Sequence, residues 1–482
     1  MNKHIKSNIY KIGTITAIAT LLFYSCVPVK NIREENTSLP ESYQNAVSTD
    51  TLNSANIDWK SFFNDAHLDS LINIALANNQ ELNIALQQVA IAKNEIKARK
   101  GEYLPFVGLQ AAGEVEKVGR YTSQGANDAN TDIKPGEEFP EPLPNYNIGL
   151  SASWEIDVWK KLRNSKKAAV MEYLSTVEGK NFMVTNLISE IADSYYELQA
   201  LDNKLIIIEQ NLELQNSGLK TIKLQKQAAR ATELGVQRLK AEVFKNKSEL
   251  FSVKQEIVET ENKINFLIGR TPQKITRDSN GFIEQKIDTI FTGIPSQLLL
   301  NRPDIRQAEY ELAAAKLNTK VARANFYPAF TIRAGIGFEA FNTKYLTSTP
   351  ESLMYSVVGD MVAPLINRNA IKAEYNTAND RQLQVVFEYE KTILQAYVDV
   401  ANELSNISNL KNSYNLKAQQ VDALTRSIDI TNKLFKSARA DYMEVLLTQR
   451  DALESKMELV ETKKDQLLAR VSMYRHLGGG WK

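Results

Sequence analysis

The chain has 482 residues, with 58 lysines and arginines against 57 aspartates and glutamates, and therefore a formal net charge of +1. This balance argues against a nucleic-acid-binding protein, because such domains are usually strongly basic. One cysteine and three histidines exclude a disulfide framework and a multi-cysteine metal site. We expect no nucleic-acid partner, no cofactor, no metal and no catalytic residues.

The N-terminus has the pattern of an export signal. Three lysines fall within the first eleven residues, an apolar run follows from Ile12 to Phe23, and Ser25 and Cys26 come next. A basic start, about a dozen apolar residues and a small residue before a cleavage point are typical of a secretory signal peptide. We therefore expect residues 1–25 to be a signal peptide.

Cys26 stands where a bacterial lipoprotein signal is cut and lipidated. Ser25 fits the pattern of such a signal, whereas Phe23 and Tyr24 replace the usual aliphatic and small residues. We predict that Cys26 is acylated. The alternatives are an ordinary signal peptide with an incidental cysteine, or an uncleaved anchor.

Residues 26–58 are polar, contain Pro28 and Pro40, and lack apolar periodicity. This composition predicts an extended tether rather than a domain. No segment of the mature chain has 18 consecutive apolar residues, so we expect no transmembrane helix. A mature chain of this kind could enter a membrane only as strands.

Two long stretches lack proline, the strongest helix breaker. Residues 161–270 contain no proline, and residues 371–476 contain neither proline nor glycine. Because leucine, lysine, glutamate and alanine are abundant there, we predict helical hairpins over about 160–269 and 370–477. Apolar residues in the second stretch recur at alternating steps of three and four, which indicates a heptad seam. Sixty helical residues span about 90 Å, so helices of this length must pack on one another.

The chain repeats itself. The segment from Ala229 to Val236 matches the segment from Ala438 to Val445, and residues 81–105 match residues 304–328. We therefore divide the mature chain into a tether (26–58), a first repeat (59–288) and a second repeat (289–482). The two alanine-rich segments are interpreted as hairpin tips.

Four stretches alternate between apolar and polar residues, at about 103–115, 145–158, 326–340 and 352–362. Half-buried strands of a soluble sandwich show the same alternation. The strand lengths, Trp154 and Trp159 near one end, and the small or charged residues of the polar face favour a lipid-facing wall around a wet lumen. Four strands cannot close a barrel and open edges are not tolerated in lipid, so several copies must contribute. A trimer would supply twelve strands.

Three short segments resemble a known family. They are Arg302-Pro303-Asp304-Ile305 followed by residues 324–328, the segment from Trp154 to Trp159, and the C-terminal segment from Leu477 to Trp481. Together they resemble the TolC-like outer membrane factors, the exit ducts of bacterial efflux and type I secretion systems. The candidate lipid anchor and the C-terminal Gly-Gly-Gly-Trp place the chain nearer the resistance-nodulation-division efflux branch.

The resemblance implies a mainly α-helical chain with a membrane β-barrel. The expected assembly is a homotrimer, with a 12-stranded β-barrel (four strands per chain) in the outer membrane and an α-helical barrel in the periplasm. The expected partners are a periplasmic adaptor protein, an inner-membrane efflux pump and outer membrane lipid, and the duct itself is not an enzyme. The alternatives are the outer membrane component of type I protein secretion and a coiled-coil scaffold lipoprotein without a channel.

The resemblance also implies functional residues at the hairpin tips. At the second tip we expect a periplasmic gate formed by Arg439, Asp441, Tyr442 and Glu444. We expect adaptor contacts at Arg230, Thr232, Glu233 and Arg439. The alternative is that these are solvated charges on a helix turn, which contribute little individually.

The tips depart from the family pattern in two respects. Ala229 and Ala438 replace the glycine that is usual in both tips, and Gly235 stands where an acidic residue is common. Any ring of gate carboxylates is therefore expected to be single.

Overall fold

The structure is a computed structural model that describes residues 33–43, 52–437 and 439–482. The export signal, Cys26 and Ala438 lie outside these residues. Within the part described, no helix is both long and apolar enough to cross a membrane.

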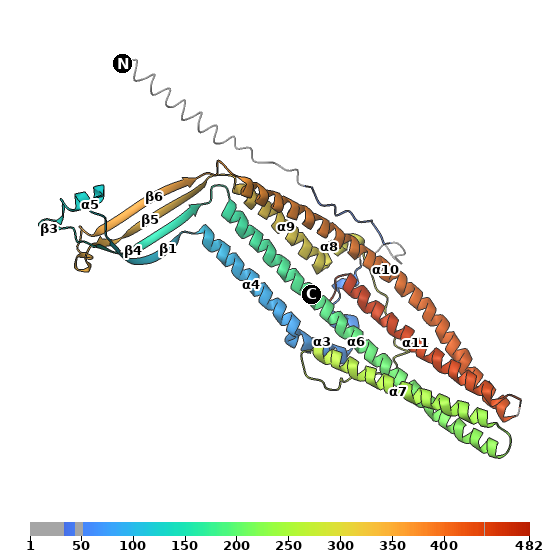
Figure 1. The fold of residues 1–482 in the computed structure, drawn as a ribbon. Helices are drawn as coiled ribbons and strands as arrows, with labels where there is room; N and C mark the ends of the chain where they lie inside the picture. Colours follow the sequence, from blue (N-terminus) through green and yellow to red (C-terminus); the bar gives the residue numbers. More distant parts are fainter. Residues whose placement is uncertain (1–32, 44–51, 438) are drawn as a thin grey trace. The chain divides into compact units, whose positions relative to one another are not determined.

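The elements follow the same order in both halves of the chain (Figure 1). The first half contains α2 (Trp59–Phe63), α3 (Ala66–Asn78), α4 (Gln80–Tyr103), β1 (Phe106–Glu116), β4 (Leu143–Ile156), α6 (Lys161–Gln227) and α7 (Glu233–Leu267). The second half contains α8 (Leu298–Asn301), α9 (Pro303–Ala324), β5 (Ala329–Ala340), β6 (Leu353–Val362), α10 (Asn369–Lys436) and α11 (Tyr442–His476). The loop between β1 and β4 adds α5 (Ser123–Asp128) and a small pair of strands, β2 (Asp132–Lys134) and β3 (Glu137–Glu138). Three short 3-10 turns complete the set: η1 (Ser54–Asn56), η2 (Pro295–Gln297) and η3 (Thr343–Tyr345).

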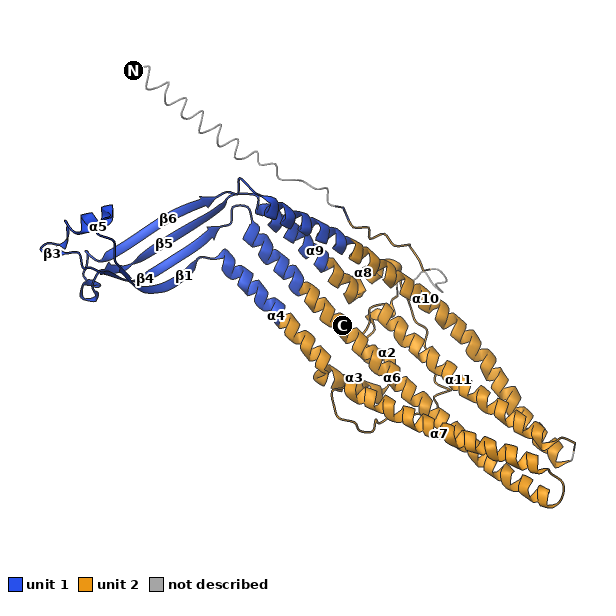
Figure 2. Ribbon diagram, in the orientation of Figure 1, with its two compact units in different colours: residues 1–34, 91–173, 310–386 blue, residues 35–90, 174–309, 387–482 orange. Residues whose placement is uncertain are grey.

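The described chain forms two compact units that draw on both halves (Figure 2). Unit 1 comprises residues 1–34, 91–173 and 310–386, of which those before 33 are not described, and it contains the strands. Unit 2 comprises residues 35–90, 174–309 and 387–482 and is built mainly of helices. The compact units therefore cut across the sequence repeat.

Unit 1 is organised around a four-stranded antiparallel sheet in the order β1-β4-β5-β6. Its register pairs Leu150 with Leu109 on one side and with Ile336 on the other, and it pairs Ile148 with Phe338. Since side chains alternate between the two faces of a strand, the apolar residues of β4 and β5 share one face. The mainly helical fold with four antiparallel strands is confirmed.

The tryptophans of the segment from Trp154 to Trp159 fasten the strand ends. The Trp159 ring stacks on Tyr327 with centroids 4.7 Å apart, and its Nε1 donates to the Pro328 carbonyl at 2.8 Å. The Nε1 of Trp154 donates to the Tyr103 carbonyl at 3.1 Å. Helix α4 continues to Tyr103, so the first strand begins at Phe106 rather than near residue 103.

Unit 2 has an apolar core where the two long hairpins meet the short helices. Ile188, Ile191 and Tyr195 of α6 are fully buried there, together with Leu68 of α3 and Leu467 of α11. The phenol of Tyr195 donates to the carboxylate of Asp65 at 3.0 Å, and Asp65 also caps the start of α3. Long helices and connecting segments are thereby held in one cluster.

The ends of the two hairpins repeat the same backbone geometry. Helix α7 is followed by Gly269 with φ 72° and helix α11 by Gly478 with φ 86°, both in the left-handed region that favours glycine. One residue further on, Arg270 N donates to Asn265 O at 2.9 Å and Gly479 N to Tyr474 O at 3.0 Å. The two donors are 209 residues apart in the sequence, and so are the two acceptors, which is the offset that relates the segment from Ala229 to the segment from Ala438.

Candidate functional site: the two hairpin tips

The first tip lies between the end of α6 at Gln227 and the start of α7 at Glu233. Arg230 N donates to Gln225 O at 2.8 Å, and Ala229 N donates to Lys226 O at 3.0 Å. Ala229 has a φ of 59°, a conformation that an L-residue with a β-carbon adopts at a cost. Ala229, which replaces the usual glycine, therefore still has the left-handed backbone conformation that favours glycine.

The second tip repeats the first over its described residues. Arg439 N donates to Leu434 O at 2.9 Å, which is the counterpart of the bond from Arg230 to Gln225 after the same offset of 209 residues. The two tips are thus related in backbone geometry as well as in sequence.

The residues expected to contact an adaptor are exposed on the first tip. The Oγ1 of Thr232 accepts a hydrogen bond from Gly235 N at 3.2 Å and so caps α7. Glu233 pairs with Lys226 across the turn and accepts a bond from Gln237, and the bond from Lys226 holds the pKa of this carboxyl below its ordinary value. The side chain of Arg230 is exposed as well, and Arg439, the fourth residue expected to contact an adaptor, is exposed on the second tip.

The residues expected to form the gate divide into two kinds. Arg439, Asp441 and Glu444 are exposed at the second tip. Asp441 occupies the N-cap of α11 but makes no capping bond with its side chain. An acidic residue at a helix start is favoured by the helix dipole, so Glu444 in the first turn suits its position. Three charged groups are thus presented to solvent in this single chain.

Tyr442, the fourth residue, is buried between the two hairpins. Burial raises its pKa to about 12. Its ring meets the ring of Phe435 edge to face, with ring centroids 5.2 Å apart. Its hydroxyl lies so close to Gly218 of α6 that a β-carbon on that residue would collide with it. Tyr442 therefore joins the two hairpins of one chain.

The contact between the hairpins is an apolar cluster. Its buried members come from three helices: Ile222, Val236, Leu239, Tyr442, Val445 and Leu446. Arg238 adds a bond from its Nη1 to the sulfur of Met443 at 3.8 Å. The cluster holds the two tips level with each other.

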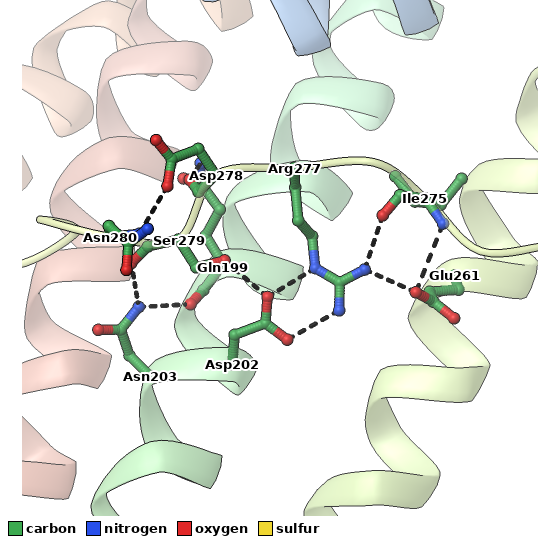
Figure 3. A network of polar contacts seen from close by, with 9 residues as sticks. All are labelled: Gln199, Asp202, Asn203, Glu261, Ile275, Arg277, Asp278, Ser279 and Asn280. Atoms are coloured by element: carbon green, nitrogen blue, oxygen red, sulfur yellow. Dashed lines mark hydrogen bonds and ion pairs between the residues drawn. The ribbon is translucent and has the colours of Figure 1, made fainter.

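A polar network fixes the segment that follows α7 (Figure 3). The guanidinium of Arg277 makes two bonds to Asp202 of α6, at 2.6 and 2.7 Å, and one to Glu261 of α7 at 2.6 Å. Asp202 also accepts a bond from Ser279 at 2.6 Å. The network ties the connection between the repeats to the first hairpin. Nothing in the sequence singled out Arg277, because its partner Asp202 lies 75 residues away.

Arg302 of the Arg-Pro-Asp-Ile motif lies at the centre of a second buried cluster. Its guanidinium makes two bonds to Asp304, at 3.0 and 2.7 Å, one to Asp399 of α10 at 3.4 Å and one to the His476 carbonyl at 3.1 Å. The motif therefore connects the start of α9 with α10 and with the end of α11. Burial lowers the pKa of the His476 imidazole to about 4, so the ring is neutral near pH 7.

The described residues contain no group of three or more histidine, cysteine, aspartate or glutamate side chains placed to hold a metal ion. The arrangement offers instead two exposed, charged helix turns on a rigid apolar joint. Such turns can contact a partner protein or line the mouth of an assembly.

Comparison with known proteins identifies relatives along most of the chain. A family model described as outer membrane efflux protein matches residues 71–270 and 294–479. The pyoverdine export outer membrane protein OpmQ of Pseudomonas aeruginosa is 27% identical over 424 residues, which cover 88% of this chain and 87% of OpmQ. The cation efflux system protein CusC of Escherichia coli O6:H1 is 26% identical over 442 residues, covering 91% and 92% of the two chains.

Solved structures show the same fold. The open state of the MtrE outer membrane channel of Neisseria gonorrhoeae superposes with a TM-score of 0.83 at 22% identity, over 95% of this chain and 99% of MtrE.

A further relative by sequence is the probable outer membrane lipoprotein SilC of Salmonella typhimurium. It is 25% identical over 426 residues, covering 88% of each chain.

Proposed function

The chain belongs to the outer membrane efflux protein family, and from this premise we propose that it is the passive exit duct of a tripartite efflux system, assembled as a homotrimer. Family membership makes it an outer membrane efflux channel rather than an enzyme. A component of an efflux system works with pump partners. In our proposal an inner-membrane pump supplies the energy, a periplasmic adaptor joins pump and duct, and the substrate is a small molecule or a metal ion.

The open sheet supports a trimer. Its edges are β1 and β6, and large apolar side chains on both edge strands are exposed in the single chain, among them Leu109 at 75% and Tyr355 at 78%. Edge strands with unpaired backbone groups are not stable in lipid. Three copies, each pairing β1 with the β6 of a neighbour, would close a twelve-stranded wall with the apolar face outward.

Three measurements test the trimeric duct. We expect outer membrane fractions to contain a heat-modifiable trimer in SDS gels, and purified protein to form conducting channels in planar bilayers. Deleting the gene should sensitise cells to drugs, detergents, bile salts or metals, and the wild-type gene should restore resistance. A monomer without conductance would contradict the proposal, as would a deletion that abolishes secretion of a protein but leaves all these sensitivities unchanged.

Lipid anchoring through Cys26 fits the path of the described tether. Asn36 N donates to the Glu390 side chain at 2.9 Å, and the ring of Tyr43 stacks on Tyr397 with centroids 5.5 Å apart. The ten residue-to-residue steps from Cys26 to Asn36 can reach about 33 Å when the chain is extended, and the 21 steps along α10 from Asn369 to Glu390 rise about 32 Å. An acyl chain on Cys26 could therefore reach the level at which α10 begins.

The anchor is tested with labelled palmitate. We expect the wild-type chain to incorporate the label and the Cys26→Ser variant to lose it. The Ser25→Ala variant is the control and should keep the label, because it retains a small residue at the cleavage point. Equal labelling of the wild type and Cys26→Ser would show that Cys26 is not the lipidated residue.

The exposed charges of the second tip support a gate at the periplasmic mouth. Arg439, Asp441 and Glu444 lie on a turn that three-fold symmetry would repeat around the axis, with Tyr442 joining each turn to its own first hairpin. Acidic side chains around a narrow pore favour cations. Arg230, Thr232 and Glu233, together with Arg439, would meet the adaptor.

The gate is tested by combining Arg439→Ala with Glu444→Ala. We expect a larger single-channel conductance and leakage of antibiotics into cells. Lys436→Ala with Asp451→Ala serves as the matched control, because it removes one charge of each sign from α10 and α11, the two helices that flank the second tip. Wild-type conductance and permeability in the Arg439→Ala, Glu444→Ala variant would contradict the gate.

A further inference from the structure

The two helices that lead into the sheet, α4 and α9, carry matching rows of basic side chains. Each row has three members: Lys93, Lys97 and Lys100 on α4, and Lys316, Lys320 and Arg323 on α9. Spacings of four and three residues place the members of a row on one side of their helix. The two rows correspond one to one at an offset of 223 residues, the offset that matches residues 81–105 with residues 304–328.

The repeat keeps the charge of the basic rows but not the charge of their neighbours. Glu95, Arg99 and Glu102 of α4 all correspond to neutral residues of α9. The guanidinium of Arg99 is paired with both of these glutamates, at 2.9 and 3.1 Å. Scattered surface lysines are ordinary. Three positions that stay basic in both halves, while the charges between them are lost, indicate a common use.

The bond of Thr319 shows which side of α9 meets its neighbour. Its Oγ1 donates to the Ala378 carbonyl of α10 at 3.3 Å, so Thr319 faces α10. The three members of the second row lie about 40–100° further around the helix, in the direction in which the chain turns. The hand of the sheet decides whether that direction leads to its apolar or to its polar side.

A single backbone bond fixes that hand. Glu339 lies on the polar face of β5, next to Phe338 on the apolar face, and its N donates to Ser352 O beside β6 at 2.8 Å. We take a view with the apolar face toward the viewer and the helices below the strands. An L-residue on a rising strand whose side chain points away from the viewer directs its N–H to the left. Therefore β6 lies to the left of β5, and α10 lies to the left of α9.

Both basic rows consequently lie on the apolar side of the sheet. A rising right-handed helix crosses its near side from left to right, so side chains that follow the left-facing Thr319 point toward the viewer. In α4 the neighbour α6 is also on the left, because β4 stands between β1 and β5. The contact of the Arg163 guanidinium with the Tyr103 ring, at 5.8 Å, marks that side of α4. The first row follows Tyr103 by about 60–120° and points the same way.

The rows lie at the level of the membrane surface. Trp154, on the apolar face, donates its indole N–H to the Tyr103 carbonyl at the end of α4, and tryptophans gather at membrane–water interfaces. Lys100 and Lys97 lie about 5 and 9 Å from Tyr103 along the helix. The polar layer beside the hydrocarbon core is about 5–7 Å thick, and long basic side chains extend their charged ends along apolar surface into it.

We propose that the basic rows bind the phosphate groups of anionic phospholipids, in the membrane leaflet next to the helices. The inference goes beyond the proposed duct and takes from it only that the sheet lies in the membrane wall. Phosphate forms strong, charge-assisted hydrogen bonds with ammonium and guanidinium groups. Basic clusters directly beside a membrane-spanning segment bind anionic headgroups. Three copies of the chain would place six such rows around the assembly.

Tryptophan quenching by brominated lipids tests the binding. The full chain is reconstituted in vesicles in which either phosphatidylglycerol or phosphatidylcholine carries bromine on its acyl chains, which quenches a nearby indole such as Trp154. We expect the wild-type protein to prefer phosphatidylglycerol about tenfold over phosphatidylcholine. The preference should disappear when four members are replaced together: Lys97→Gln, Lys100→Gln, Lys320→Gln and Arg323→Gln. Lys97→Gln with Lys100→Gln alone should lose part of it, and this pair serves if the fourfold variant does not fold.

The matched control removes four positive charges from exposed positions of the hairpin of α6 and α7. It consists of Lys220→Gln, Lys223→Gln, Lys247→Gln and Lys254→Gln. We expect this control to keep the preference for phosphatidylglycerol. A second control exchanges the basic residues for one another and should keep it too: Lys97→Arg, Lys100→Arg, Lys320→Arg and Arg323→Lys.

Four results would overturn the proposal. They are equal quenching of the wild type by the two lipids, loss of the preference in the hairpin control, displacement of phosphatidylglycerol by an excess of inorganic phosphate, and an altered conductance of the fourfold variant in planar bilayers. Displacement would identify free phosphate as the ligand, and altered conductance would place the rows in the lumen. A wild-type trimer that conducts but shows no lipid preference would leave the proposed duct intact.

Discussion

Asn79 and Arg302 occupy equivalent positions in the two halves of the chain, and the side chain of each holds the end of a long helix. The Nδ2 of Asn79 donates to the Leu267 carbonyl at the end of α7 at 2.8 Å, and the Nη1 of Arg302 donates to the His476 carbonyl at the end of α11 at 3.1 Å. Helix ends leave carbonyls without intrahelical partners, so each bond satisfies a group that would otherwise be buried unpaired. A neutral amide performs in the first repeat what a charged guanidinium performs in the second.

Replacing Arg302 should therefore cost more than replacing Asn79. Arg302→Ala leaves Asp304 and Asp399 without their shared partner, which we expect to destabilise the chain by about 3–5 kcal/mol. Asn79→Ala removes neutral bonds only and should cost about 1–3 kcal/mol. Thermal unfolding of the two variants in detergent, followed by circular dichroism, checks the order. Equal losses would show that the charges near Arg302 contribute little.

The first tip should become more stable when its alanine is replaced. Ala229 has a φ of 59°, which costs an L-residue about 1–2 kcal/mol relative to its preferred conformations, whereas glycine adopts it freely. We expect Ala229→Gly to stabilise the tip by about 1 kcal/mol and to lower hydrogen exchange of the adjacent amides. Ala231→Gly is the control, and it should be neutral or destabilising. Faster exchange in Ala229→Gly would contradict this prediction. It would show that the greater entropy glycine gives to the unfolded chain outweighs the relief of backbone strain at the tip.

The elements of this fold could be predicted because their signals are local. Strand alternation around Trp154 and the absence of proline after Lys160 are each read from neighbouring residues. Contacts between distant segments carry no such signal. Arg277 meets Asp202 across 75 residues, and Tyr442 packs between hairpins instead of lying exposed beside Glu444.

The internal repeat was the one long-range signal that the sequence did offer. An offset of 209 residues related the two tips, and the backbone bonds of Arg230 and Arg439 follow it, whereas an offset of 223 residues relates Asn79 to Arg302. The offset could not show which side chain replaces another in function. Asn79 and Arg302 differ in size and charge, and only their common target, the last carbonyl of a long helix, makes them equivalent.

Stability should fall as the pH rises through the titration of Asp193. Burial raises the pKa of this carboxyl to about 6. The positive charges of Arg475 and Lys263 lower the pKa in part, and the negative charges of Glu190 and Glu403 raise it further. One oxygen of Asp193 is buried without a hydrogen-bond partner. The folded chain therefore binds more protons than the unfolded chain between about pH 4 and 6, so the free energy of unfolding decreases across that range.

Asp193→Asn removes this titration. We expect the variant to be more stable at pH 7 by about 1–3 kcal/mol and to lose the decline between pH 4 and 6. Glu190→Gln, one turn away and exposed, should keep the decline. Unfolding midpoints measured from pH 4 to 8 decide, and an unchanged pH profile in Asp193→Asn would assign the decline to another group.

The joint between the hairpins should depend on the absence of a side chain at Gly218. A β-carbon there would collide with the hydroxyl of Tyr442, so we expect Gly218→Ala to destabilise the tips by about 1–3 kcal/mol and to raise antibiotic leakage. Tyr442→Phe removes that hydroxyl and keeps the ring in the apolar cluster. The double variant should therefore recover most of the stability that Gly218→Ala loses. In a double-mutant cycle the two changes should then be less destabilising together than the sum of their separate effects. Failure of Tyr442→Phe to rescue Gly218→Ala, in both unfolding midpoint and leakage, would place the strain elsewhere in α6.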